Sequence, residues 1–409
     1  MKICLFTLGC RVNSYESDAL CSKLAKKGHI VTSGTLVDAD LYILNTCAVT
    51  SEAERKSVQC ISRIKKINKG AKIIVCGCAS QHSPQRFKKD GVSYISGTSN
   101  KLDLVNKLDE IGESDFLEEK EYTECRAGVY RAKTYIKIQD GCNNFCSYCI
   151  IPYLRGRSRS RKIEDAVAEI NNCASSEVVL TGINLSAFGK ERGESLTDLI
   201  RALSNCHKRI SLGSISVGLI DDNFLTALKN LKNFCPHFHI SLQSGSNKVL
   251  ADMNRKYTRE QYLEKVKLIE KYFDIPSITT DVIVGYPTES ESDFLETLDL
   301  VRECKMSDLH IFPYSPRLGT KGYKLGRLDG ELVQKRVQRI TNLREKLKKD
   351  YFDKIKKANC KVLIEESDGE YFVGYSERYV RVYVKGKFNQ GDIVTVKAVK
   401  EYKDGLSAE

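Results

Sequence analysis

The sequence Asp140-Gly141-Cys142-Asn143-Asn144-Phe145-Cys146-Ser147-Tyr148-Cys149 places three cysteines in Cys-x3-Cys-x2-Cys spacing, directly after a predicted strand at residues 134–138. A structural zinc site usually has four protein ligands, and no fourth cysteine or histidine lies close by. A 4Fe-4S cluster held by three cysteines leaves one iron open, and that iron can chelate the amino and carboxylate groups of S-adenosylmethionine. The spacing therefore predicts a cluster that cleaves S-adenosylmethionine by reduction.

The cysteine motif opens a long alternation of predicted strands and helices. Strands are expected near residues 134–138, 177–181, 210–215, 237–242, 278–284 and 309–312, and helices include residues 163–172 and 293–303. About six βα units with buried parallel strands fit either an open doubly wound sheet or a partial barrel. Periodicity alone leaves both architectures open.

Residues 1–112 show a separate βαβ pattern. Strands are predicted at 2–7, 41–45 and 72–76, with helices beginning at Ser14 and Glu52. Two capping boxes are predicted at these helix starts, Asn13 with Glu16 and Ser51 with Glu54, and Gly28 is expected to end the first helix. Residues 113–131 are highly charged and are interpreted as a linker.

A second, dispersed set of cysteines follows the three predicted strands of this first region, in Gly9-Cys10, Asn45-Thr46-Cys47 and Gly77-Cys78. Ligands of open α/β sheets bind outside the carboxyl ends of the strands, so these cysteines can meet in space. They predict a second three-cysteine cluster. The alternative is that they are small apolar side chains at the end of a Rossmann-like sheet.

Residues 331–357 predict a long basic helix, followed by short β-rich runs at 360–366, 371–375, 379–384 and 393–399 that predict a small β-barrel. Basic and aromatic residues alternate there, as in RNA-binding strands: Arg378, Tyr379, Arg381, Tyr383, Lys385 and Lys387. Near the cluster motif, Arg155, Arg157, Arg159 and Arg161 would point one way if extended, which favours a phosphate track over a solvated charge run.

Composition narrows the class of protein. The chain has 409 residues, of which 41% are hydrophobic and 29% charged, so wholesale disorder is excluded. No apolar stretch approaches the roughly 20 residues of a membrane span, and the start resembles no signal peptide, so a cytoplasmic protein without membrane contact is expected. Sixteen cysteines in a reducing compartment favour cluster ligation over disulfides. A net charge of +12 admits a polyanionic partner.

Taken together, these motifs resemble the methylthiotransferases of the radical S-adenosylmethionine (SAM) superfamily over nearly the whole chain. The matching segments are Thr7–Cys10 with Asn13, Asn45–Cys47, Gly77-Cys78 with Gln81, the three clustered cysteines, Ile151–Arg161, Leu242–Gly245, Met253–Thr258 and Asp281–Pro287. Ala48-Val49-Thr50 and the segment from His310 to Thr320 look most like the branch that acts on threonylcarbamoyladenosine 37 of tRNA.

The resemblance implies an α/β protein of three domains. These are a Rossmann-like methylthiotransferase domain (1–112), a radical SAM core built as a partial (β/α)6 barrel (132–345), and a TRAM domain that holds RNA (346–409). It implies that Cys142, Cys146 and Cys149 hold the cluster that cleaves SAM. Cys10, Cys47 and Cys78 would hold an auxiliary 4Fe-4S cluster whose open iron carries the sulfur to be inserted.

The same resemblance implies the residues around SAM: Tyr148, Thr181, Gly182, Asn184, Gln243, Ile283 and Gly285. Each also has an ordinary structural interpretation, such as a core aromatic ring or a turn at a strand end. Clusters of this kind need a low-potential electron donor, for which a flavodoxin or ferredoxin is the expectation, while the sulfur donor is left open.

Three alternatives are kept. The same chemistry can act on isopentenyladenosine 37 of tRNA, or on an aspartate of a ribosomal protein. A non-catalytic RNA-binding protein with structural zinc is the third. One segment departs from the family: where an acidic residue and a proline are usual, this chain has Ser216-Val217.

Overall fold

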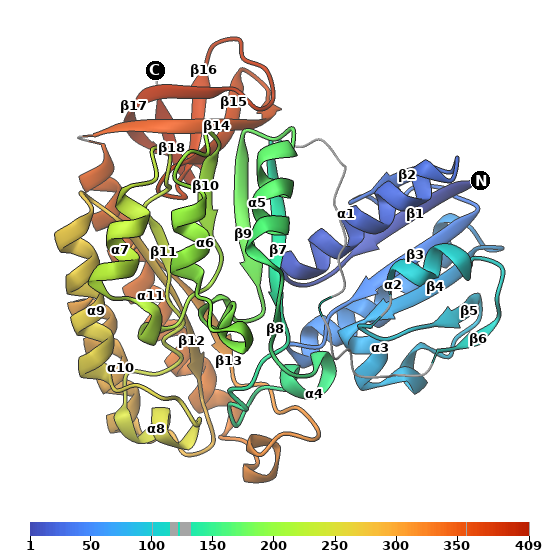
Figure 1. Cartoon of the computed structure of the whole chain (residues 1–409). Helices are drawn as coiled ribbons and strands as arrows, with labels where there is room; N and C mark the ends of the chain where they lie inside the picture. The colour runs from blue at the N-terminus through green and yellow to red at the C-terminus, as the bar shows by residue number, and fades with distance from the viewer. Residues whose placement is uncertain (100, 115–121, 123–131, 357, 409) are drawn as a thin grey trace. The chain divides into compact units, whose positions relative to one another are not determined.

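The computed structural model describes residues 1–99, 101–114, 122, 132–356 and 358–408. They form two compact units (Figure 1). The first comprises Met1–Val129, Tyr135–Arg161 and Ser315–Tyr323, and the second comprises Tyr130–Thr134, Lys162–Tyr314 and Lys324–Glu409. Most of the expected linker, 115–121 and 123–131, lies outside the described residues. The division into domains at 112, 131 and 345 stays a prediction.

The first unit is built on a six-stranded parallel sheet of order β2-β1-β3-β4-β5-β6. Its strands are β1 Lys2–Thr7, β2 Ile30–Ser33, β3 Leu41–Thr46, β4 Lys72–Gly77, β5 Val92–Ile95 and β6 Gly112–Glu113. The helices are α1 Arg11–Lys26, α2 Ser51–Ile67 and the short α3 Cys78–His82. Two apolar clusters, one containing Leu44 and Val75 and the other Ile43 and Ile74, bury both faces of the central strands, as parallel sheets require. The expected α/β pattern of this region is confirmed.

Both predicted capping boxes are wrong. Helix α1 begins at Arg11, so Asn13 and Glu16 lie inside it, and their buried side chains bond to other elements of the first unit. Helix α2 is capped by Thr50, whose side chain accepts a hydrogen bond from the backbone of Ala53. Short polar residues at helix starts serve either as caps or as ligands for neighbours, and spacing alone does not separate the two uses. The stop at Gly28 is confirmed, since α1 ends at Lys26.

The cluster motif belongs to the first unit. It follows β7, Lys133–Asp140, and precedes α4, Ile151–Arg155, and β8, Arg159–Ser160, which pairs antiparallel with the end of β7. Ile150 and Leu154 of this segment are buried in the same apolar cluster as Phe87 and Val75. The motif is therefore anchored to the core of the six-stranded sheet.

The second unit contains a parallel array. It runs from β9, Glu177–Gly182, and β10, Arg209–Leu212, to β11, His237–His239, β12, Ser277–Val284, and β13, Asp308–Pro313. Two parallel bridges, Ile210 with Phe234 and Ile215 with Ile240, continue the array from β10 to β11. Figure 1 shows helices on the outer side of these strands, namely α5 Ile163–Asn172, α6 Leu196–Ala202, α7 Asp222–Lys229, α8 Asn247–Asp252, α9 Arg259–Tyr272, α10 Glu291–Glu303 and α11 Gly330–Ile355.

After α11 the chain forms a small closed barrel of order β14-β15-β16-β18-β17. The strands are β14 Asn359–Asp368, β15 Tyr371–Ser376, β16 Arg381–Lys385, β17 Ile393–Tyr402 and β18 Gly405–Ala408. The sequence predicted four of these strands and missed β18, a four-residue strand whose only strongly apolar side chain is Leu406. Tyr351 and Phe352 near the end of α11 are buried in the barrel core, so helix and barrel share one apolar cluster.

Candidate functional site

Cys10, Cys47 and Cys78 lie at one edge of the first unit, because they follow the carboxyl ends of the neighbouring parallel strands β1, β3 and β4. Cys47 and Cys78 follow their strands directly, and Cys10 comes three residues after the last residue of β1. Cys10 is exposed, whereas Cys47 and Cys78 are buried. Ligands of parallel sheets bind at this edge, so the topology brings together the three cysteines that the sequence singled out.

Two glycines let these loops approach one another. Gly9 has φ +109°, and a Cβ there would lie 2.8 Å from the Cβ and 2.9 Å from the Sγ of Cys47. Gly77 has φ +107°, and its Cβ would lie 2.6 Å from the carbonyl oxygen of Thr46. Only glycine adopts such φ values without strain and leaves room for a neighbouring backbone. The residue before Cys10 and the residue before Cys78 are therefore both dictated by the close approach of the Cys47 loop.

The electrostatics of the two buried thiols, Cys47 and Cys78, fit cluster ligands. Burial, together with repulsion from the neighbouring Cys78 and Cys10 thiolates, raises the pKa of Cys47 to about 12. Burial also raises the pKa of Cys78, whereas the positive charges of Arg155 and Lys101 lower it. Three neighbouring sulfurs, two of them in a dry environment with cations beside them, suit a metal cluster that neutralises thiolate charge.

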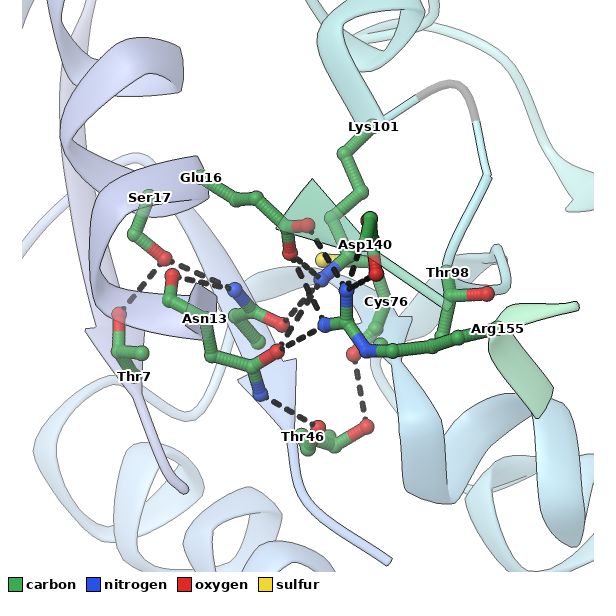
Figure 2. Close-up of polar contacts among 12 residues, drawn as sticks. Thr7, Asn13, Glu16, Ser17, Thr46, Cys76, Thr98, Lys101, Asp140 and Arg155 are labelled. Atoms are coloured by element: carbon green, nitrogen blue, oxygen red, sulfur yellow. Dashed lines mark hydrogen bonds and ion pairs between the residues drawn. The ribbon is translucent and has the colours of Figure 1, made fainter. Parts of the chain in front are cut away.

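A buried polar network lies next to these loops (Figure 2). The Arg155 guanidinium donates to Glu16 Oε1 at 3.0 Å, to Asp140 Oδ1 at 3.1 Å and to Asn13 Oδ1 at 2.7 Å. Lys101 Nζ donates to Glu16 Oε2 at 2.6 Å and to Asn45 Oδ1 at 3.0 Å. These side chains come from α1, the end of β3, the 3-10 helix Lys101–Asn106, the end of β7 and α4, so one network joins elements that flank both cysteine sets.

Positive charge exceeds negative charge among the described members of this network. Lys137 bonds to both Glu16, at 3.0 Å, and Asp140, at 3.1 Å, and Arg159 lies 3.3 Å from Asp140. Four cations therefore surround two carboxylates. Burial opposes ionisation of Glu16, but the charges of Arg155, Lys101 and Lys137 outweigh it and hold its pKa well below the usual range. Glu16 is therefore ionised inside the folded first unit.

The loop of Cys142, Cys146 and Cys149 is held by its backbone. The Cys142 N–H donates to Gly156 O at 3.0 Å, and the Cys149 N–H donates to Cys146 O at 2.9 Å. Gly322, from the Ser315–Tyr323 segment of the same unit, donates to Ser147 O at 2.6 Å. Because Arg155 contacts Asp140 two residues before Cys142 and also lies beside Cys78, it links this loop to the auxiliary cysteines.

The expectation that four arginines line one extended phosphate track is wrong for Arg155, Arg159 and Arg161. Arg155, Arg159 and Arg161 are only 2%, 7% and 1% exposed, since Arg155 ends a helix and both it and Arg159 pair with Asp140. Only Arg157 is exposed, and its guanidinium lies over the ring of Phe145, 4.8 Å from the centroid. The alternation of arginines reflects bonding inside the protein rather than an extended surface strand.

The residues expected to contact SAM belong to both compact units. Tyr148 lies in the cluster loop of the first unit. In the second unit, Thr181 and Gly182 end β9, Ile283 lies near the end of β12, and Asn184, Gln243 and Gly285 follow strand ends. Gln243 has φ +74°, and its backbone donates to Asp281 O at 2.8 Å and accepts from the Ile283 N–H at 2.9 Å. These residues of the second unit therefore share the carboxyl edge of its parallel array, where ligands of such arrays bind.

Gly285 has a structural reason of its own, because a Cβ there would lie 2.5 Å from Cγ2 of Val333 in α11. Its close approach is to a helix of this chain. Ser216 and Val217 stand where the family usually has an acidic residue and a proline. Here the Ser216 N–H donates a hydrogen bond to Ser186 Oγ at 2.8 Å.

Comparisons with known proteins agree with this geometry. Residues 136–301 match the model of the radical SAM superfamily, and residues 2–97 match that of the uncharacterized protein family UPF0004. The threonylcarbamoyladenosine tRNA methylthiotransferase MtaB of Aquifex aeolicus is 36% identical, covering 97% of this chain and all of the relative. The MtaB protein of Bacillus subtilis is 34% identical over 97% of this chain and 94% of its own. This chain belongs to the radical SAM methylthiotransferase family.

Relatives within the methylthiotransferase family carry two different names. A tRNA-2-methylthio-N(6)-dimethylallyladenosine synthase of Lachnoclostridium phytofermentans is 35% identical over 96% of this chain and 91% of its own. Among solved structures, the radical SAM methyltransferase TsrM of Kitasatospora setae matches with a TM-score of 0.57 and 15% identity, over 77% of this chain and 75% of its own. That likeness concerns the fold alone. No helix among the described residues is both long and apolar enough to cross a membrane.

The structure also shows contacts near the Cys47 loop that the sequence did not predict. Glu54, at the start of α2, binds Arg317, and it also binds Arg86 at 2.6 Å, while the Ser51 N–H donates to Ser315 Oγ at 2.9 Å. The segment 315–323 is thereby fixed beside the Cys47 loop. Pairing between residues more than 260 positions apart leaves no local pattern in the sequence.

The basic residues of the C-terminal barrel differ in how far contacts within the protein already engage them. Arg378 donates to Ile275 O at 3.0 Å and pairs with Glu377. Arg381 bridges Asp404 at 3.0 Å and Glu366 at 2.8 Å. Lys385 is exposed, 5.7 Å from the ring centroid of Tyr371. The two arginines are therefore partly engaged by the barrel itself.

Proposed function

We propose that this chain methylthiolates C2 of N6-threonylcarbamoyladenosine at position 37 of tRNA, which gives 2-methylthio-N6-threonylcarbamoyladenosine. The observation that carries the proposal is the presence of two sets of three cysteines in the first unit, joined by the buried network of Arg155. Relatives named for this reaction match 97% of the chain.

The chemistry of the reaction explains why two sets of three cysteines are needed. C2 of adenine carries a C–H bond that no side-chain base ionises near neutral pH, so its replacement requires a radical route. A 4Fe-4S cluster on Cys142, Cys146 and Cys149 would supply the electron that cleaves SAM, and an auxiliary 4Fe-4S cluster on Cys10, Cys47 and Cys78 would carry the sulfur. The cations of the Arg155 network offset the negative charge that thiolates bring into a buried site.

Cofactor and RNA contacts complete the proposal. SAM would be bound by Tyr148 and the strand-end residues Thr181, Gly182, Asn184, Gln243, Ile283 and Gly285. The C-terminal barrel would act as a TRAM domain that holds tRNA through Arg378, Arg381 and Lys385, assisted by the exposed Arg157. The reaction would take place in the cytoplasm, with a flavodoxin or ferredoxin as electron donor.

The competing substrate within the family is isopentenyladenosine 37, because a dimethylallyladenosine synthase is nearly as similar, at 35% identity. Nucleoside analysis separates the two. Total tRNA from cells with and without the gene is digested and its modified nucleosides are compared by mass spectrometry.

Loss of methylthio-threonylcarbamoyladenosine with accumulation of its unthiolated precursor is the expected result, restored by the wild-type gene but not by a Cys142→Ala variant. Loss of the isopentenyl counterpart alone would place the chain on the other branch. Stoichiometric zinc without SAM cleavage would favour the RNA-binding alternative.

A further inference from the structure

Three polar side chains meet on the parallel array of the second unit, and none of them is among the residues assigned above to a cluster, SAM or RNA. Asp281 Oδ1 lies 3.3 Å from His239 Nε2 and 3.2 Å from His310 Nδ1. The three residues stand on the neighbouring strands β11, β12 and β13. Their potential metal-ligand atoms, two imidazole nitrogens and a carboxylate oxygen, all lie within 4.8 Å of one another.

Strand register places these side chains on one face of the array. His239 is paired with Thr279 and Asp281 with His310, and paired residues of parallel strands point the same way. The opposite face is covered, since the ring of Phe238 lies 5.6 Å from that of Phe234 and 5.3 Å from that of Phe273. The polar group therefore stands on the face opposite the covering aromatic rings.

This face is also open, increasingly so from β11 to β13. The side chains of His239, Asp281 and His310 are 10%, 25% and 55% exposed. Phe312, two residues beyond His310 on the same strand face, is 39% exposed. Ile283, a proposed SAM contact, follows Asp281 by two residues on the same face of β12. Along β12, the polar group thus lies just before the strand end at which SAM is expected to bind.

The group is held in place by further hydrogen bonds. His239 Nδ1 lies 2.9 Å from Thr279 Oγ1, which also contacts His237 Nε2 at 2.8 Å. Burial opposes ionisation of Asp281, but hydrogen bonds from His239 and His310 outweigh it and hold its pKa well below the usual range. An ionised carboxylate with imidazoles on two sides offers both acceptors and donors to a ligand.

These properties discriminate between the two tRNA substrates of the family. The threonylcarbamoyl group carries a carboxylate, a hydroxyl and urea N–H groups, whereas the isopentenyl group is a pure hydrocarbon. A ligand that covers these polar groups without pairing them is disfavoured, because the covered groups lose their hydrogen bonds to water. The polar face therefore matches the first substrate and opposes the second.

We propose that His239, Asp281 and His310 form the subsite for the threonylcarbamoyl side chain of the target adenosine. His310, the most exposed of the three, donates to the carboxylate, and Asp281 accepts from a urea N–H or the hydroxyl. His239 is a positioning residue that orients Asp281. This inference rests on the proposed function, and it explains how this chain would select its substrate.

The test measures binding of anticodon stem-loops to the reconstituted full-length enzyme by fluorescence anisotropy. Stem-loops carry either threonylcarbamoyladenosine or plain adenosine at position 37, so their ratio of Kd values isolates the side chain. His310→Leu and Asp281→Asn are compared with His207→Leu, an exposed histidine of the same unit outside the group. Loss of a hydrogen bond to a charged group lowers the preference about 10- to 100-fold.

The expected result is a wild-type preference for the modified stem-loop that His310→Leu and Asp281→Asn abolish, with affinity for the plain stem-loop and iron content unchanged. His207→Leu keeps the wild-type preference. A preference that survives both substitutions would overturn the subsite and leave the proposed function standing. Absence of any preference in the wild type would also overturn the subsite, while the nucleoside analysis decides the proposed function independently. One non-iron metal ion per chain that is lost in His310→Leu would overturn the subsite in favour of a metal centre.

Discussion

Replacing Glu16 by glutamine tests the buried network that joins the two cysteine loops. Glu16 pairs with Lys101 at 2.6 Å and with Lys137 and Arg155 at 3.0 Å each, and it is only 6% exposed. Removing one partner of a buried ion pair costs about 3–5 kcal/mol, because the charges left behind stay desolvated. Here each cation keeps another acceptor, so the loss lies near the lower end, about 3 kcal/mol.

The matched control is Glu110→Gln, which breaks a pair of similar length, 2.8 Å to Lys107, whose side chains are 37% and 49% exposed. Exposed pairs contribute about 0–1 kcal/mol. Urea unfolding of the metal-free protein, read by hydrogen exchange of amides in β3 and β4, reports the stability of the first unit. Equal losses for the two variants would refute the assigned role of the network.

The pH dependence gives a second readout for Glu16→Gln. The folded-state pKa of Glu16 is held well below its usual value, so its stabilisation is fully present above the unfolded pKa, about 4.3. As pH falls below that value, the unfolded chain binds a proton that the folded chain does not, and the stabilisation is lost. The difference in stability between wild type and variant should therefore shrink from pH 7 to pH 3. A difference that stays constant over this range would contradict the charge-based explanation.

Three further predictions concern the cysteine loops. Gly77→Ala should lower the iron bound by Cys10, Cys47 and Cys78 while the Cys142 loop keeps its cluster, because the new Cβ would lie 2.6 Å from Thr46 O. The control Gly70→Ala makes only an ordinary contact at 3.6 Å and should keep the wild-type iron content. Arg317→Met should destabilise the first unit by about 3 kcal/mol, because it breaks a buried ion pair with Glu54. The control Arg86→Met removes a half-exposed partner of the same carboxylate and should lower the free energy of unfolding by about 1 kcal/mol or less. In metal-free protein at pH 8, iodoacetamide should label the exposed Cys10 faster than Cys47, because burial raises the Cys47 pKa to about 12; mass spectrometry of timed digests measures both, and equal rates would contradict the geometry.

Much of the fold could be predicted because its patterns are local. The strands that carry Cys10, Cys47 and Cys78 are apolar runs ended by polar or glycine residues, and a parallel sheet necessarily places their carboxyl ends at one edge. Helix α5 was predicted with its bounds at Ile163 and Asn172 because its apolar periodicity is short and uninterrupted. Strand β18 was missed because it is short and weakly apolar, and only its pairing with β16 and β17 makes it a strand.

The errors concern polar residues whose partners are distant in sequence. Asn13 and Glu16 have the spacing of a helix cap but bind Arg155, some 140 residues later. Arg155, Arg159 and Arg161 have the spacing of an exposed strand, but two of them bind the buried Asp140 and all three are enclosed. A charge pattern does not specify whether its partner is solvent, substrate or a buried carboxylate. For that reason the network and the His239 group became visible only in three dimensions.

The account depends most on the claim that two separate cysteine triads each hold a 4Fe-4S cluster. Iron and acid-labile sulfide are therefore quantified after anaerobic reconstitution of the wild type and of two triple alanine variants, one at Cys10, Cys47 and Cys78 and the other at Cys142, Cys146 and Cys149. Two clusters correspond to about eight iron atoms per chain in the wild type and about four in each variant, and only the first variant should still cleave SAM. About four iron atoms in the wild type, unchanged when Cys10, Cys47 and Cys78 are removed, would contradict the account.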